Sequence, residues 1–142
     1  MNRFIASALA IAFAAAGTLL ADQSRPWNNP SGGSLAAGCR HFTYYSNANK
    51  TTIGFIVYLP PGYDANTSAR YPVVYSLHGM GGDEWSHLPY VGALQSNIQS
   101  QAVDPMIMVF VNGRGNTIYA DSKDGSVKCE TGIIEELIHG GE

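Results

Sequence analysis

The residues of this chain best suited to chemistry form a glycine-rich turn, His78-Gly79-Met80-Gly81-Gly82, that directly follows an apolar run. The run, residues 73–77, is short, β-branched and nearly continuous, which is typical of a buried strand. A His-Gly-X-Gly-Gly turn after such a strand can supply a backbone N–H to a carbonyl oxygen that gains negative charge. Glycines allow this close approach because they carry no Cβ atom. Ester or other acyl chemistry is therefore the leading hypothesis.

A nucleophile for that chemistry is not found in the sequence. An activated serine of this class lies in a Gly-X-Ser-X-Gly turn between a strand and a helix, and this pattern does not occur in the 142 residues. Ser34, in Gly32-Gly33-Ser34-Leu35-Ala36, is the nearest imitation, but no strand is predicted before it. The chain as written is therefore not expected to hydrolyse esters at an enzymatic rate.

The elements that would position the turn begin with antiparallel strands. Residues 41–45 have β character, and residues 52–59 alternate, with apolar side chains at every second position. Ile53, Phe55, Val57 and Leu59 would share one face of the second segment. Such a period of two predicts a half-buried antiparallel strand.

A strand, a helix and a second strand follow. Residues 73–77 and 106–111 are apolar runs that indicate strands covered on both faces, as in a parallel sheet. Between them, apolar residues recur at helical spacing, at Val91, Leu94, Ile98 and Ala102. A second amphipathic segment places Ile133, Ile134, Leu137 and Ile138 on one side and Glu135 and Glu136 on the other. The sequence therefore predicts an α/β domain with a βαβ crossover.

The N-terminal segments are predicted to lie outside that domain. Residues 1–21 resemble a secretory signal peptide, because Arg3 precedes an apolar stretch that ends in small residues. A membrane anchor is the alternative, although about 17 apolar residues are marginal for spanning a bilayer. Residues 22–40 are rich in Pro, Gly, Asn and Ser and are interpreted as a leader or linker. The domain would then occupy residues 41–142.

The charge indicates which binding partners to expect, and the cysteine content indicates whether a disulfide can form. The net charge of −3, with 13% charged residues, shows no basic patch, so neither nucleic acid nor an anionic membrane surface is an expected partner. Cys39 and Cys129 are the two cysteines. In an oxidising compartment they are candidates for one disulfide, and the alternative is two unrelated buried thiols.

Several motifs together resemble one known family. They are Tyr58-Leu59-Pro60-Pro61-Gly62-Tyr63, Arg70-Tyr71-Pro72-Val73-Val74-Tyr75, Leu77-His78-Gly79-Met80-Gly81-Gly82 with Trp85 nearby, Asn112-Gly113-Arg114-Gly115-Asn116, and residues 130–138. This combination resembles the esterase-D-like branch of the α/β-hydrolases, and its secreted feruloyl and acetylxylan esterases most closely. The resemblance implies an α/β-hydrolase fold that is truncated before the strand of the nucleophile elbow.

The resemblance also implies roles for particular residues. The Met80 N–H would be the oxyanion-hole donor, with His78 and Gly79 in the same loop, where His78 holds the loop by hydrogen bonding. Gly81, Gly82, Trp85 and Asn112 would contact substrate, although Trp85 is equally well explained as a packing residue. His78, Asp83 and His87 match no standard metal-ligand spacing. No metal and no other cofactor is expected.

The function implied by the resemblance is that of a secreted carboxylic ester hydrolase with a Ser-His-Asp/Glu triad. In this family the nucleophile would begin about 15 to 25 residues beyond residue 138, and the acid and the histidine would follow it. The expected substrate is an ester, such as acylated plant cell-wall polysaccharide. Two rivals are an acyltransferase of the same family and a non-catalytic secreted protein that binds carbohydrate or ester ligands. The sequence does not indicate an oligomeric state.

Overall fold

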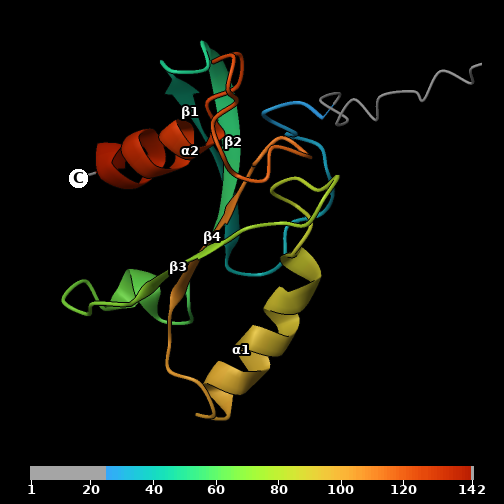
Figure 1. The fold of residues 1–142 in the computed structure, drawn as a ribbon. Coiled ribbons are helices and arrows are strands. Elements are labelled where there is room, and N and C mark those ends of the chain that lie inside the picture. Colours follow the sequence, from blue (N-terminus) through green and yellow to red (C-terminus); the bar gives the residue numbers. More distant parts are fainter. Residues whose placement is uncertain (1–24, 142) are drawn as a thin grey trace, which may run out of the picture.

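A four-stranded sheet forms the centre of the computed structural model, which describes residues 25–141 (Figure 1). In spatial order its strands are β1 (Cys39–Ser46), β2 (Thr51–Tyr58), β4 (Ile107–Val111) and β3 (Val73–Ser76). β2 pairs antiparallel with both β1 and β4, whereas β3 and β4 are parallel. The signal peptide predicted for residues 1–21 lies outside the described residues and stays a prediction.

Helices cover both faces of this sheet. The helix α1 (Val91–Gln99) connects β3 to β4 and forms the predicted crossover. The short helix α2 (Cys129–Thr131) continues as a π-helical segment, Gly132–Ile138, and ends in a 3-10 turn, His139–Gly141. Two further 3-10 turns span Tyr63–Ala65 and Leu88–Tyr90. Among residues 25–141, no helix combines the length and the apolar character that crossing a membrane requires.

The core has two layers because successive residues of a strand point to opposite faces. Phe110 packs with Ile56, Tyr58 and Val91 on the face that α1 covers. Its neighbours Val109 and Val111 pack instead with Val127, Cys129 and Ile133 below the C-terminal helical segment. The βαβ unit and the second helical segment that the sequence predicted are therefore confirmed.

The burial of β2 and β3 differs from the prediction. β2 was expected to be half-buried, but Ile56 and Tyr58 on its other face are fully buried. It is covered on both sides because it lies between β1 and β4, below helices on each face. β3 was expected to be covered on both faces, yet Val73 and Val74 are 48% and 40% exposed. Within the described residues β3 is an edge strand, which explains this exposure.

The leader interpretation is wrong for residues 25–40. Trp27 and Ala36 pack against the two core layers, and the Trp27 carbonyl accepts a hydrogen bond from Gly54 N–H at 2.7 Å. β1 already begins at Cys39. The segment shows no periodicity because it runs irregularly over the sheet, and partners distant in sequence satisfy its polar groups.

The outward position predicted for Glu136 is also wrong. Its carboxylate accepts hydrogen bonds from the Ser46 hydroxyl and from Ala48 N–H, the latter at 2.9 Å. Ile134, which was expected to face the core, is 40% exposed. A π-helical turn bonds residue i to i+5, so its faces do not follow the 3.6-residue period on which the prediction rested.

The predicted disulfide is absent, because Cys39 and Cys129 are both free thiols. Cys39 packs in the core layer below α1, whereas Cys129 belongs to the layer on the opposite face of the sheet. The sheet therefore lies between the two sulfur atoms. The alternative reading, two unrelated buried thiols, is the one that the structure supports.

We expect thiol titration without reductant to find two reactive thiols, and only after unfolding. Burial raises the pKa of Cys39 to about 11 from 9.0, and it also raises the pKa of Cys129. A shift of that size lowers the thiolate fraction near pH 8 about 100-fold, and the thiolate is the reactive form. Rapid labelling of the folded protein, or a mobility shift on reduction, would contradict this expectation.

Candidate active site

The glycine-rich turn lies where β3 and β4 end. The turn leaves β3, and residues 112–116 leave β4. Because carboxyl ends of parallel strands meet at one edge of a sheet, the two loops come together there. Gly82 and Gly115 form an isolated β-bridge. Gly81 N–H donates to Gly115 O at 3.1 Å and to the Asn116 side-chain oxygen at 3.0 Å.

His78 links the two loops through both nitrogens of its ring. Its side chain is buried, and Nε2 accepts the Gly113 N–H at 2.9 Å. Since Nε2 is the acceptor, the proton of the neutral ring lies on Nδ1. That Nδ1–H donates to Gly79 O at 2.7 Å. These are the loop-holding hydrogen bonds that were expected of His78.

The orientation of the Gly79–Met80 peptide follows from these bonds. Gly79 O accepts both the His78 Nδ1–H and the Gly82 N–H, the latter at 3.1 Å. The described residues contain no cis peptide, and in a trans peptide the C=O and N–H point in opposite directions. Met80 N–H therefore points away from the two donors. Within residues 25–141 it has no hydrogen-bond acceptor.

A pocket of about 280 Å³ lies beside this peptide. It is lined by His78, Gly79, Met80, Gly115, Asn116, Ile118 and Tyr119. The side chains of Met80 and Ile118 are 88% and 87% exposed, so two large apolar groups flank the pocket. A backbone donor beside apolar walls suits a ligand with a carbonyl group attached to an apolar body.

Ile118 and Tyr119 also line this pocket, although no motif in the sequence marked them. Both have positive φ angles, 50° and 57°, which are rare for a β-branched or bulky residue. The Tyr119 hydroxyl donates to His78 O at 2.8 Å. Burial, followed by the nearby Cys129, raises the pKa of Tyr119, so the hydroxyl keeps its proton and stays a donor. Strained backbone of this kind is concentrated at functional sites.

Four residues predicted to contact substrate make contacts within the protein, and their contact with substrate stays a prediction. Gly81 N–H is already bonded within the turn, and Gly81 has a φ of 75° that favours glycine. A Cβ at Gly82 would lie 2.9 Å from His78 Nδ1. Asn112 is buried and binds Glu84 and Pro26. The two glycines therefore shape the turn, and Asn112 is not among the residues that line the pocket.

Trp85, the fourth of these residues, is a packing residue. Its Nε1–H donates to Asn29 O at 2.5 Å, and its ring stacks on His41 with centroids 5.8 Å apart. It also packs against the core layer below α1. The packing alternative therefore describes Trp85 better than the predicted contact with substrate.

Replacing Trp85 with phenylalanine should lower the free energy of unfolding by about 1–2 kcal/mol, because a partly buried hydrogen bond and part of the ring contact are lost. Chemical denaturation monitored by circular dichroism measures this change. Unchanged stability together with a raised KM would favour the predicted cleft position instead.

The three residues considered for a metal site each contact a different part of the protein. His78 binds Gly113, Asp83 accepts from Asn29 Nδ2 at 2.9 Å, and His87 Nδ1 lies 2.7 Å from Ser76 Oγ. Across the part of the chain that the structure describes, no three His, Cys, Asp or Glu side chains gather into a metal site.

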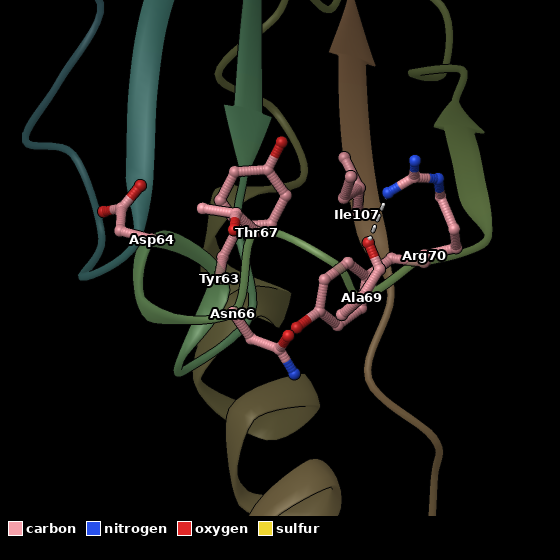
Figure 2. A pocket seen from close by; sticks show the side chains of 8 residues that line it. Tyr63, Asp64, Asn66, Thr67, Ala69, Arg70 and Ile107 are labelled. Carbon is pink, nitrogen blue, oxygen red and sulfur yellow. Dashed lines mark hydrogen bonds between the residues drawn. The ribbon is translucent and has the colours of Figure 1, made fainter.

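A larger pocket, of about 420 Å³, lies at the other end of β4 (Figure 2). Figure 2 shows its lining, which comes from the loop that leads into β3 and from Ile107 at the start of β4. Arg70 in this lining donates to Ala69 O at 3.2 Å. The glycine-rich turn follows the opposite end of β3, so this pocket is separate from the candidate site.

A protein-family model matches residues 46–138, which is most of the chain. Its description is "Putative esterase". The chain belongs to this esterase family. The matched range includes the whole glycine-rich turn and the loop that follows β4.

Solved structures of esterases resemble the chain. One is a ferulic acid esterase with 28% identity and a TM-score of 0.64, over 73% of this chain and 43% of that one. Another is a CE1 ferulic acid esterase from Anaeromyces mucronatus, with 25% identity and a TM-score of 0.55, over 80% of this chain and 46% of that one.

A third solved structure is also similar to the chain in fold. It is an S-formylglutathione hydrolase from Agrobacterium tumefaciens, with 20% identity and a TM-score of 0.55, over 73% of this chain and 43% of that one. The α/β-hydrolase fold predicted from the sequence is confirmed. The chain spans less than half the length of each of these three relatives.

Proposed function

We propose that this chain supplies the oxyanion-binding part of a carboxylic ester hydrolase. The observation that carries the proposal is the Gly79–Met80 peptide, whose carbonyl is held by two donors while its N–H has no acceptor among residues 25–141. An ester carbonyl placed in the adjoining pocket would accept this N–H. The bond would strengthen as the carbonyl oxygen gains negative charge in the transition state.

The reaction requires a serine in a Gly-X-Ser-X-Gly turn, a motif that the sequence does not contain. A serine activated by a histidine would attack the carbonyl and form an acyl-enzyme, which water would then hydrolyse. In this fold the second oxyanion donor is the N–H of the residue after the nucleophile. Here the chain contributes the first donor, the turn that fixes it and one wall of the acyl pocket.

The substrate we propose is a feruloyl or related aromatic ester on plant cell-wall polysaccharide. Two of the similar structures are ferulic acid esterases, and the Anaeromyces mucronatus enzyme also has a structure in complex with ferulic acid. Met80 and Ile118 add apolar walls that suit an aromatic acyl group. The apolar segment at residues 4–16 supports secretion as part of the same proposal.

The experiment that tests the proposal begins with the natural transcript, sequenced through and beyond the codon for Glu142. Its protein product is then assayed with methyl ferulate and with an aryl acetate. A reading frame that reaches Gly-X-Ser-X-Gly, together with hydrolysis of methyl ferulate, would support the proposal. A stop codon after Glu142 and a product that binds ferulate without turnover would contradict it and favour the non-catalytic rival.

A further inference from the structure

Glu84, two residues after the glycine-rich turn, is a carboxylate with no exposed surface. No motif in the sequence marked it, and its side chain does not line the pocket. Burial of an ionised carboxylate is strongly unfavourable unless donors satisfy its oxygens. We propose that Glu84 is a positioning residue that fixes the Met80 N–H through Asn112. This inference rests on the proposed function.

Three segments of the chain surround the Glu84 carboxylate. Oε1 accepts the Asn29 N–H at 2.8 Å and lies 3.1 Å from His41 Nε2. Oε2 accepts Asn112 Nδ2–H at 2.6 Å. One buried side chain therefore joins residues 25–29, β1 and the loop after β4.

Asn112 connects the Glu84 carboxylate to residues 112–114, the loop that contacts His78. Its Nδ2 also donates to Pro26 O at 3.1 Å, so both amide hydrogens have acceptors. The amide orientation is thereby fixed, and Oδ1 accepts the Arg114 N–H at 2.8 Å. The path of residues 112–114 is set by these bonds.

The same loop then meets His78. Gly113 N–H donates to His78 Nε2, which leaves the proton on Nδ1 for Gly79 O. Holding Gly79 O fixes the direction of the Met80 N–H, and Met80 lines the pocket. The contacts thus run without a gap from Glu84, through Asn112 and His78, to the proposed oxyanion donor.

A carboxylate is required at position 84 because each of its oxygens accepts from a fixed donor, Oε1 from the Asn29 N–H and Oε2 from the Asn112 Nδ2–H. Glutamine would place an NH₂ group against either the Asn112 Nδ2–H or the Asn29 N–H. If the Asn112 amide turned over to relieve the first conflict, Arg114 N–H would lose its acceptor. Glu84→Gln should therefore loosen residues 112–114 although it is nearly isosteric.

Asp83 offers a matched control. It is also a buried carboxylate, and it accepts from Arg25 at 3.4 Å, Asn29 Nδ2 at 2.9 Å and Trp85 N–H at 3.0 Å. None of its hydrogen bonds within residues 25–141 reaches the loop after β4. Asp83→Asn therefore removes a similar buried charge but leaves the contacts of Asn112 in place.

The test is amide hydrogen exchange of the purified protein, measured by NMR for both variants. In Glu84→Gln we expect exchange at Gly113 and Gly81 to be at least about tenfold faster, with less than about a twofold change at Val109 in β4. In Asp83→Asn we expect faster exchange at Trp85 and a change below about twofold at Gly113.

Two results would overturn the inference. One is unchanged exchange at Gly113 in Glu84→Gln, and the other is an equal acceleration of all amides, which would show a general effect on stability. If Glu84→Gln does not fold, Asn112→Ala removes the same link from its other end. It is then compared with Asp83→Asn by the same criteria.

An activity measurement completes the test if the protein encoded by the natural transcript hydrolyses methyl ferulate. Glu84→Gln should lower kcat at least about tenfold with KM within about twofold, because the Met80 N–H acts mainly in the transition state. An unchanged kcat would overturn the inference. If the unmodified protein has no activity, the proposed function fails, while the exchange data still decide the role of Glu84 in the turn.

Discussion

Replacing Met80 with proline is expected to reduce kcat for ester hydrolysis about 100- to 1000-fold, since loss of one oxyanion donor has an effect of that size. Proline carries no backbone N–H, so the proposed donor disappears while the peptide carbonyl of Gly79 remains. Met80 is not among the described residues with a positive φ, which makes the negative φ of proline compatible with this position. The measurement is a steady-state assay with methyl ferulate of the protein encoded by the natural transcript.

Met80→Leu is the control for this prediction. It keeps the N–H and changes only a side chain that is 88% exposed, so kcat should stay within about threefold of the unmodified protein. A Met80→Pro variant that retains full kcat would show that Met80 N–H does not bind the oxyanion. Circular dichroism of both variants establishes that each one is folded.

Replacing Gly54 with alanine is expected to cost about 3 kcal/mol of the free energy of unfolding, at the upper end of the range for overpacking a core. Gly54 is buried in β2, and a Cβ there would lie 2.6 Å from Glu84 Oε1 and 2.7 Å from Asn28 Oδ1. Glu84 cannot move aside without losing its bonds to Asn29, His41 and Asn112. Urea denaturation monitored by circular dichroism gives the free energy of unfolding.

Gly92→Ala should raise the free energy of unfolding, whereas Gly54→Ala should lower it. Gly92 lies on the exposed side of α1, and a Cβ there would meet no atom within 4 Å. Alanine in a helix is favoured over glycine by about 0.5–1 kcal/mol, so the variant should be slightly more stable. Equal effects of the two substitutions would contradict the packing described around Gly54.

Local patterns in the sequence predicted much of the fold. Helical spacing of apolar residues placed α1 correctly, and a continuous apolar run placed β4, because both patterns report how a single element is buried. The His78–Gly82 motif also identified the turn, since its glycines mark a backbone path that other residues adopt with difficulty. Turn chemistry and periodicity are properties of neighbouring residues and need no knowledge of the rest of the chain.

Residues 25–29 and Glu84 show what local patterns cannot indicate. Asn29 and Glu84 are bonded across 55 positions of sequence, and Glu84 and Asn112 across 28. In the sequence the first segment has the composition of a linker, and Glu84 has the appearance of a solvated charge. Their roles depend on the order of the strands, which brings three distant segments around one carboxylate.

The α/β class, the glycine-rich turn and the place of His78 in it followed from local sequence patterns. Only the folded chain shows that β3 is an edge strand of the described residues, that Cys39 and Cys129 lie on opposite faces, and that Trp85 packs against the core. The direction of the Met80 N–H is also a property of the folded chain, since it depends on two donors to Gly79 O. Segments distant in sequence set the burial and the hydrogen-bond partners of a residue, whereas its neighbours set its conformational preference.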